Sequence, residues 1–348
     1  MGIGIRVRGI GLHGRFGARM IGIGIVGCGN MGGSHARAIG AVAETKLVAG
    51  AEVAAERRER FTREFGVECH ADLRALLERD DVDAVAIALP HDLHAEATVA
   101  ALKAGKHVLC EKPMAMSVDE CDGMLAAAAR AHKKLMIGLT WHFFPTTLKM
   151  HELAAAGEIG DPVFGHDSLA KNWGFAKREE WFKSRARGGG MLLANAVHQI
   201  DRLSWIMGDR VTGVHGLVGS FQHSQDADDM GMASLRFSKG GLGAIRCFGY
   251  AKGGDDHRIE VWGTEGALRF DEGKLYRGRG DKWEPVETEQ WTPLQREWKE
   301  FARCVVEDRP EPVDGGWGKY TLQVLLALEE SSRTSAAVAV EAEPALLR

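Results

Sequence analysis

A glycine-rich loop near the start of the sequence has the residue types that bind phosphate groups. Residues 27–32 read GCGNMG, and they follow an apolar run over 21–26 and precede a predicted helix. A strand, a GxGxxG loop and a helix in this order are typical of dinucleotide-binding folds. Gly27 allows a tight turn, Gly29 lets the backbone approach a pyrophosphate, and Gly32 lets the helix pack close to the strand. We predict a dinucleotide-binding loop made by Gly27, Gly29, Asn30, Met31 and Gly32.

An acidic residue follows the second predicted strand, 46–51, at the distance from the loop that such folds use. At this place the carboxylate of Glu52 can accept hydrogen bonds from the hydroxyls of an adenosine ribose. It would repel the 2′-phosphate of NADP, so we expect NAD as the preferred cofactor and NADP as the alternative. Arg57 and Arg58 could soften that repulsion, but we expect them on a solvated helix face, paired with glutamates of the same helix.

A lysine next to a proline is the best candidate for proton transfer. Residues 110–114 read CEKPM, and Pro113 disfavours a helical conformation for Lys112 and holds it extended. The segment follows a predicted strand over 107–109, at the end of the sheet where open α/β folds bind ligands. A lysine that is partly desolvated there can act as a general base toward a hydroxyl group as hydride leaves. The alternative is a surface lysine paired with Glu111.

Two histidines after the third predicted strand have the spacing of metal ligands. His91 and His94 are separated by two residues, but neither a third ligand, an HExxH motif nor a cysteine pair is found. We therefore expect no metal.

These residues must be positioned by alternating strands and helices in the first half of the sequence. Such alternation predicts parallel βαβ units. The expected strands are 21–26, 46–51, 83–89, 107–109 and 135–139, and the expected helices are 31–40, 54–65, 94–104 and 117–133.

The second half has a different pattern, with strand-like runs separated by Gly, Asp and Lys turns. It predicts a mostly antiparallel sheet, interrupted by one helix over 197–207 and closed by two helices. The expected strands are 163–170, 211–221, 230–237, 241–250, 257–262 and 266–270, and the closing helices are about 294–307 and 317–334.

Several segments, taken together and in this order, resemble one protein family. They read GCGNMG, AIALPHDLHAEATVAALKAGKHVLCEKPMAMS, GGGMLLANAVHQID and HRIEVWGTEGALRF, followed by the closing helix. From about Met20 to the end, the sequence resembles the glucose–fructose oxidoreductase / inositol dehydrogenase (Gfo/Idh/MocA) family. This resemblance implies an N-terminal Rossmann domain with a doubly wound parallel sheet, and a C-terminal domain with a large open, mostly antiparallel sheet.

The resemblance also implies NAD(P)-dependent oxidation or reduction of sugars, polyols and related cyclic diols. The family's Glu-Lys-Pro motif maps onto Glu111, Lys112 and Pro113, and its lysine contacts substrate and nicotinamide and often serves as acid or base. Lys112 takes that role here. By the same resemblance, Pro90 and His91 lie in a loop that contacts the nicotinamide and ribose. The other predicted cofactor contacts are His94, Glu111 and Lys112, and the alternative for His94 is that it caps the helix it opens.

The family's second motif, roughly GGGxLxDxGxH, maps onto the segment from Gly188 to His198. The family's aspartate is Ala194 in this sequence, and alanine can neither move protons nor hold a diol. The proton chemistry therefore shifts to Lys112 and His198, which are the predicted catalytic residues, and Asn195 could supply a hydrogen bond. His198, Arg202 and Trp205 are expected to form a polar stripe on their helix.

Aromatic residues that precede this motif in the sequence are candidates for substrate contact, because tryptophan faces stack on sugar or aromatic rings. Hydrophobic packing beneath a loop is the alternative. The predicted substrate-binding residues are Lys112, Trp141, Trp173, Asn195 and His198.

We interpret the sequence as that of an enzyme that transfers a hydride between nicotinamide and a carbinol carbon of a sugar, polyol or cyclic diol. Two alternatives stay open. One is a hydrolase or lyase of the same fold that oxidises a sugar transiently and regenerates bound NAD. The other is a non-catalytic dinucleotide sensor, which the missing aspartate suggests.

Composition limits the partners. The chain has 348 residues, 26% of them charged, with a net charge of −4, so no basic excess points to nucleic acid or to an anionic membrane. No apolar run approaches the roughly 20 residues of a membrane span. The six widely spaced cysteines indicate reduced thiols in a cytoplasmic enzyme.

The length fits two domains. We expect a poorly ordered extension over 1–19, a dinucleotide-binding domain over 20–141, and a domain for substrate binding and oligomerisation over 142–348. An open sheet leaves one face bare, so we expect a homodimer or homotetramer.

Overall fold

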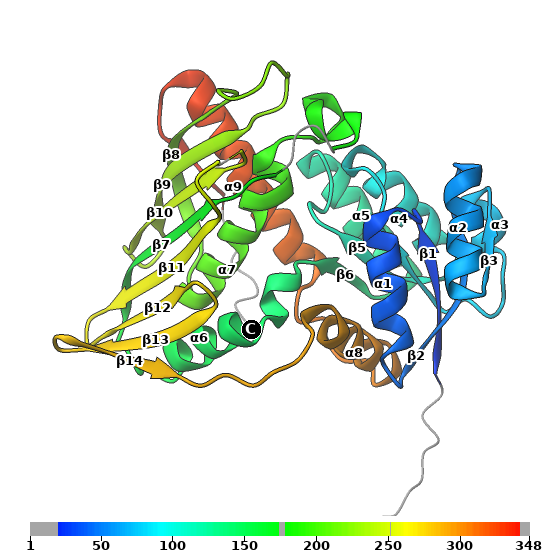
Figure 1. Cartoon of the computed structure of the whole chain (residues 1–348), viewed down its shortest axis with the longest axis horizontal. Coiled ribbons are helices and arrows are strands. Elements are labelled where there is room, and N and C mark those ends of the chain that lie inside the picture. Colours follow the sequence, from blue (N-terminus) through cyan, green and yellow to red (C-terminus); the bar gives the residue numbers. More distant parts are fainter. Residues whose placement is uncertain (1–19, 174–177, 251, 342–348) are drawn as a thin grey trace, which may run out of the picture.

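The computed structural model describes residues 20–341, except 174–177 and 251 (Figure 1). The predicted extension over 1–19 lies outside the described residues. Two sheets form the molecule: a parallel one in the first half of the chain and a larger one in the second half. The predicted fold class is confirmed.

The parallel sheet has six strands in the order β3-β2-β1-β4-β5-β6, and every neighbouring pair is parallel. All residues of β1 and β4 are buried, as expected for a sheet that is covered by helices on both faces. The strands are β1 (Ile21–Val26), β2 (Thr45–Ala51), β3 (Glu68–His70), β4 (Ala84–Ile87), β5 (His107–Glu111) and β6 (Leu135–Gly138). The helices are α1 (Asn30–Gly40), α2 (Ala55–Phe65), α3 (Leu73–Leu77), α4 (His94–Lys103) and α5 (Val118–Ala131).

The large sheet has nine strands within the described residues, in the order β14-β13-β12-β11-β7-β10-β9-β8-β15. All neighbouring pairs are antiparallel except β7 and β10. The strands are β7 (Pro162–Ala170), β8 (Val211–Gly219), β9 (Met230–Phe237), β10 (Leu242–Phe248), β11 (Asp256–Gly263), β12 (Ala267–Asp271), β13 (Lys274–Arg279), β14 (Lys282–Val286) and β15 (Val338–Ala339).

The fold has four further helices: α6 (Pro145–Ala155), α7 (Val197–Met207), α8 (Pro293–Val306) and α9 (Gly315–Thr334). Helix α9 contacts β8, α7 and α5, so it packs against both halves of the molecule (Figure 1). Helix α7 lies close to the large sheet because β7 has a glycine there. A Cβ atom at Gly165 would lie 2.7 Å from Leu203 Cδ1.

The sequence patterns miss several short or late elements: β3, α3, α6, β13, β14 and β15. Strand β3 has three residues, which is too short for an alternating pattern to be visible. Helix α6 begins at Pro145, just after the predicted boundary between residues 141 and 142. Proline is well suited to the first position of a helix, because its missing N–H has no partner there in any case.

Candidate active site

A groove of about 550 Å³ runs along the carboxyl ends of the parallel strands. All of the predicted cofactor residues except Gly32 line this groove. They are Gly27, Gly29, Asn30, Met31, Glu52, Pro90, His91, His94, Glu111 and Lys112. The opposite wall comes from a segment that precedes α7, through Arg178, Glu179, Trp181, Phe182 and Arg187. The groove therefore lies between the two halves of the molecule.

The glycine loop has the shape that a pyrophosphate requires. Gly27 has a φ of 90°, and a Cβ there would lie 2.5 Å from the carbonyl oxygen of Ala88. A Cβ at Gly32 would lie 2.0 Å from the oxygen of Gly27, so this glycine lets α1 pack against the strand. At Gly29, by contrast, a Cβ would meet only Arg57 Nη1, at 3.7 Å, so the backbone there faces the open groove. No side chain caps the first N–H groups of α1, which leaves them available to phosphate oxygens.

Glu52 lies at the base of the groove beside this loop. Its two carboxylate oxygens accept the N–H groups of Cys28, at 3.1 Å, and Ala54, at 3.0 Å. The side chain is thereby fixed, with lone pairs left for ribose hydroxyls.

The expected pairing of the two arginines of α2 with Glu56 and Glu59 is wrong. Arg57 lines the groove and lies 3.1 Å from Glu179 of the opposite wall. Arg58 donates to the carbonyl oxygen of Glu52 at 2.9 Å. Glu179 is brought close to Arg57 by the tertiary structure, which the helical spacing does not reveal. The contact of Arg58 is local, because Glu52 lies just before the same helix.

His91 joins the two walls of the groove. Its Nδ1 lies 2.6 Å from the carbonyl oxygen of Gly188, and its ring packs edge-on against Trp181 with centroids 4.8 Å apart. Burial holds the pKa of His91 well below its usual range, so the neutral ring donates its N–H to that carbonyl. His94 lies between the carbonyl oxygens of Pro113, at 2.8 Å, and Leu89, at 3.0 Å.

The carboxylate of Glu111 is held by His35 of α1 and by the backbone N–H of Lys112, which donates to Glu111 Oε2 at 3.2 Å. Trp298 Nε1 donates to His35 Nδ1 at 3.0 Å, which leaves the proton of His35 on Nε2. That nitrogen donates to Glu111 Oε1 at 2.9 Å. Burial alone would raise the pKa of Glu111, but the hydrogen bond from His35 holds it below its usual value. Glu111 therefore stays ionised and fixes the backbone on which Lys112 is carried.

The amine of Lys112 reaches the second motif. It is partly buried, and its Nζ donates to the carbonyl oxygen of Ala194 at 2.8 Å. Burial lowers the pKa of Lys112; the charge of Glu111 opposes this shift and that of Arg178 adds to it. Ala194 therefore contributes a backbone oxygen to the lysine, although its side chain supplies no group.

His198 lies at the start of α7, after one wide helical turn over Leu192–Ala196. Its Nδ1 is buried and has no hydrogen-bond partner among the described residues. Burial, with the nearby charges of Lys112 and Arg202, holds the pKa of His198 well below its usual range. The ring is therefore neutral, and a buried nitrogen remains free to bind an arriving group.

The expected polar stripe on α7 is buried in part. Arg202 is 1% exposed and donates from Nε to Asp167 Oδ2 at 2.5 Å and from Nη2 to Oδ1 at 2.9 Å. Its guanidinium lies 4.3 Å from the ring centroid of Trp141, which is partly exposed and has its centroid 6.3 Å from that of His198. The buried pair thus fixes both Trp141 and the helix that carries His198.

Two other predicted substrate residues are largely enclosed. Trp173 is 4% exposed, with the guanidinium of Arg178 4.8 Å from its ring centroid. Asn195 is 7% exposed, and its Nδ2 lies 3.2 Å from Met191 Sδ.

Lys171 belongs to the aromatic and basic stretch before the second motif, for which substrate contact is plausible from the sequence, but it is not among the predicted site residues. It follows β7, and its N–H continues the ladder to Phe248 at 2.9 Å. Because side chains alternate along a strand, it lies on the same face as Gly165 and Asp167, which α7 covers. Burial, then the charge of Lys112, lowers the pKa of Lys171 to about 8. The alternation of side chains along the predicted strand is therefore the sequence signal that could have identified Lys171 as a site residue.

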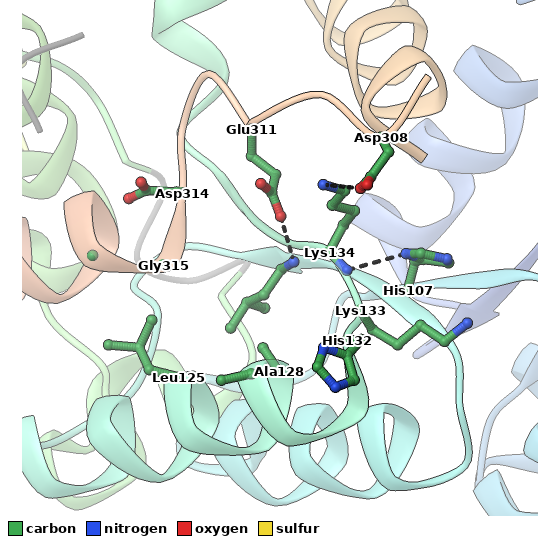
Figure 2. Close-up of a pocket in the computed structure, with 13 residues that line it drawn as sticks. His107, Leu125, Ala128, His132, Lys133, Lys134, Asp308, Glu311, Asp314 and Gly315 are labelled. Carbon is green, nitrogen blue, oxygen red and sulfur yellow. Dashed lines mark hydrogen bonds and ion pairs between the residues drawn. The ribbon is translucent and has the colours of Figure 1, made fainter. Parts of the chain in front are cut away.

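A second hollow, of about 570 Å³, lies at the opposite end of the parallel sheet, where β5 and β6 begin (Figure 2). Three of its charged groups are engaged: Lys134 Nζ lies 2.8 Å from Asp308 Oδ1, and Glu311 Oε1 accepts the N–H of Leu135 at 3.0 Å. Because open parallel sheets bind ligands at the carboxyl ends of their strands, we place no cofactor here.

Two family models match the chain. Residues 21–139 match the NAD-binding Rossmann fold of the Gfo/Idh/MocA oxidoreductases, and residues 147–269 match the family's C-terminal domain. The chain belongs to the Gfo/Idh/MocA oxidoreductase family. The predicted resemblance is confirmed. This Gfo/Idh/MocA protein is therefore an oxidoreductase with NAD as its cofactor, as expected.

Named relatives of this Gfo/Idh/MocA protein cover much of its length. It is 28% identical to a myo-inositol 2-dehydrogenase of Thermotoga maritima, over 92% of this chain and 98% of that protein. It is 30% identical to a 2,7-anhydro-N-acetylneuraminate hydratase of Escherichia coli, over 72% and 68% respectively. Its fold matches that of a levoglucosan dehydrogenase in complex with NADH, with a TM-score of 0.87, 23% identity, and coverage of 93% and 100%.

None of the described helices has the length and apolar character of a membrane span. Nor do three or more His, Cys, Asp or Glu side chains cluster as a metal site in the part of the chain that the structure describes.

Proposed function

We propose that this oxidoreductase acts on a carbinol carbon of a sugar, polyol or related cyclic diol, with Lys112 and His198 as its catalytic residues. One observation carries the proposal: the amine of Lys112 lies at the end of the dinucleotide groove and donates to Ala194 of the second motif at 2.8 Å. This contact joins a desolvated lysine to the segment that carries His198.

The protonation states of Lys112 and His198 suggest a different role for each residue. Bound NAD supplies the hydride acceptor at C4 of its nicotinamide. Lys112, whose pKa is lowered by burial, takes the hydroxyl proton of the substrate in its free amine form. His198 is neutral, and its unpartnered Nδ1 can bind and orient the same hydroxyl oxygen or its neighbour. Trp141 is partly exposed nearby, but Phe144 stacks on one face of its ring, with centroids 4.1 Å apart, and the guanidinium of Arg202 lies over the other. It can therefore offer the substrate a ring edge rather than a ring face.

A panel of inositols, sugars and dihydrodiols, followed by the absorbance of NADH, tests this function. We expect NADH to form with at least one member of the panel. The relationship to a hydratase supports a second candidate, in which oxidation is transient and bound NAD is regenerated. Product formed without net NADH would favour that second candidate.

Glu52 should determine the cofactor preference. Glu52→Ala removes an acceptor for ribose hydroxyls and the charge that repels a 2′-phosphate, and Arg57 remains in the groove. We expect NAD to bind about 10- to 100-fold more weakly, the cost of hydrogen bonds to a charged group. Binding of NADP should weaken less. Fluorescence titration with both cofactors measures this, and Glu56→Ala, on the exposed face of α2, is the control. An unchanged ratio of the two affinities would assign Glu52 no role in the choice.

A carboxylate at the family's aspartate position should raise the pKa of Lys112. Ala194 is 5% exposed, and its carbonyl oxygen already contacts Lys112 Nζ. In Ala194→Asp, a nearby negative charge favours the ammonium form, so the rise of kcat/KM with pH should move to higher pH. Because the new charge is also desolvated, activity at neutral pH should fall. Rate profiles of both proteins test this, and an unshifted profile would place residue 194 away from the amine.

We further propose a cytoplasmic homodimer or homotetramer. The outer face of the large sheet exposes apolar side chains that a second copy could cover: Leu217, Met232, Leu242 and Trp262. All six cysteines are free thiols in the structure, which suits a reducing compartment. A monomer in sedimentation velocity would exclude the oligomer.

A further inference from the structure

Two cysteines that are distant in sequence meet directly beneath the dinucleotide loop. Cys28 is the residue between Gly27 and Gly29, and Cys69 belongs to β3 at the edge of the parallel sheet. Their Sγ atoms lie 3.5 Å apart. Strand β2 separates β1 from β3, so this contact passes over β2.

A glycine of β2 makes the contact possible. Gly50 pairs with Cys69 on one side and with Ile25 on the other. A Cβ at Gly50 would lie 2.9 Å from Cys28 Sγ and 3.0 Å from Cys69 Sγ. Any larger residue at this position would therefore fill the space that the two thiols share.

Cys69 differs chemically from the other five cysteines. Within the pair it is the more reactive thiol, because the hydrogen bond to Cys69 and burial raise the pKa of Cys28. Burial raises the pKa of Cys110 and Cys121 to about 12 and that of Cys304 to about 11, and it also raises the pKa of Cys247. Such thiols are unreactive, because the thiolate is the nucleophile. Cys69 is partly exposed, and the hydrogen bond from Cys28 lowers its pKa.

We propose that Cys28 and Cys69 are a redox modification site, which forms a reversible disulfide with a peroxide as oxidant and thereby weakens dinucleotide binding. The Cys69 thiolate attacks a peroxide oxygen, the O–O bond breaks, and a sulfenic acid forms as water leaves. Cys28 then attacks the sulfenic sulfur; the S–S bond forms, the S–O bond breaks, and a second water leaves. Two thiols lose two electrons and two protons, and hydrogen peroxide becomes two waters.

The disulfide should disturb the cofactor site because its bond is shorter than the present contact. The sulfurs must close from 3.5 Å to about 2.05 Å, which moves Cys28 or the strand that carries Cys69. The N–H of Cys28 donates to Glu52 at 3.1 Å, and its neighbours Gly27 and Gly29 form the phosphate loop. A shift of Cys28 therefore changes both groups that hold the dinucleotide. By linkage, bound NAD should disfavour the disulfide at equilibrium by the same factor as the disulfide weakens NAD binding.

The experiment uses the full chain, treated with hydrogen peroxide and then freed of it. We expect peptide mapping to identify a Cys28–Cys69 linkage, and fluorescence titration to give about tenfold weaker NAD binding, the loss of about one hydrogen bond to a charged group. Dithiothreitol should restore the affinity. Cys69→Ser should bind NAD normally and be insensitive to the oxidant, whereas Cys121→Ser should respond like the parent protein.

Two results would overturn the proposal. One is that both thiols remain free, or oxidise to other products, at peroxide concentrations that leave the fold intact by circular dichroism. The other is a linked Cys28–Cys69 peptide in a protein whose NAD affinity is unchanged. If Cys69→Ser does not fold, Cys69→Ala gives the same comparison.

Discussion

Replacing Lys112 with alanine should lower turnover about 100- to 10,000-fold, the usual cost of losing a positioned general base. The free amine is the active form for oxidation, so kcat/KM of the parent protein should rise with pH until Lys112 is deprotonated. That rise should occur below the usual range of lysine, because burial lowers the pKa of Lys112. In Lys112→Ala this limb of the profile should disappear.

The binding of NAD separates a catalytic defect from a structural one. The glycine loop and Glu52 hold the other end of the groove, so the affinity of Lys112→Ala for NAD should change much less than its turnover. Lys46→Ala, an exposed lysine of β2, is the matched control and should behave like the parent protein. Parental turnover of Lys112→Ala on a proven substrate would show that another group moves the proton.

Arg202→Met should lower the free energy of unfolding by about 3–5 kcal/mol, the usual cost of breaking a buried ion pair. Arg202 is 1% exposed and Asp167 is 0% exposed, so the substitution leaves an uncompensated buried carboxylate. Urea unfolding followed by tryptophan fluorescence measures the loss. The variant also loses the guanidinium beneath Trp141, so the substrate KM should rise.

The matched control is Arg246→Met, because Arg246 pairs with Asp256 at the same distance of 2.5 Å but with both side chains about half exposed. An exposed pair contributes about 0–1 kcal/mol, so this variant should unfold almost like the parent protein. Replacing both partners, as in Arg202→Met with Asp167→Leu, should recover part of the lost stability. Equal losses in the two single variants would contradict a special role for burial.

The local patterns of the sequence determined the architecture and the cofactor loop. The strand before Gly27, the glycines and the helix after them are neighbours in the chain, so their spacing alone identifies the motif. Alternation of strands and helices likewise predicts the parallel sheet, because each element depends on residues close in sequence. Elements without a repeating pattern, such as the three-residue β3, could not be found this way.

Only the tertiary structure decided how the charged and polar side chains are used. Lys112 was a candidate from its motif, but its partner, the carbonyl oxygen of Ala194, is 82 residues away. Arg202 has the helical spacing of a polar stripe, yet Asp167 of β7 holds it in the interior. The contact of Cys28 with Cys69 depends on Gly50 of a third strand. Helical and strand periods show which residues share a face of one element. The partner of each charged or polar side chain depends instead on the packing of segments that are far apart in the chain.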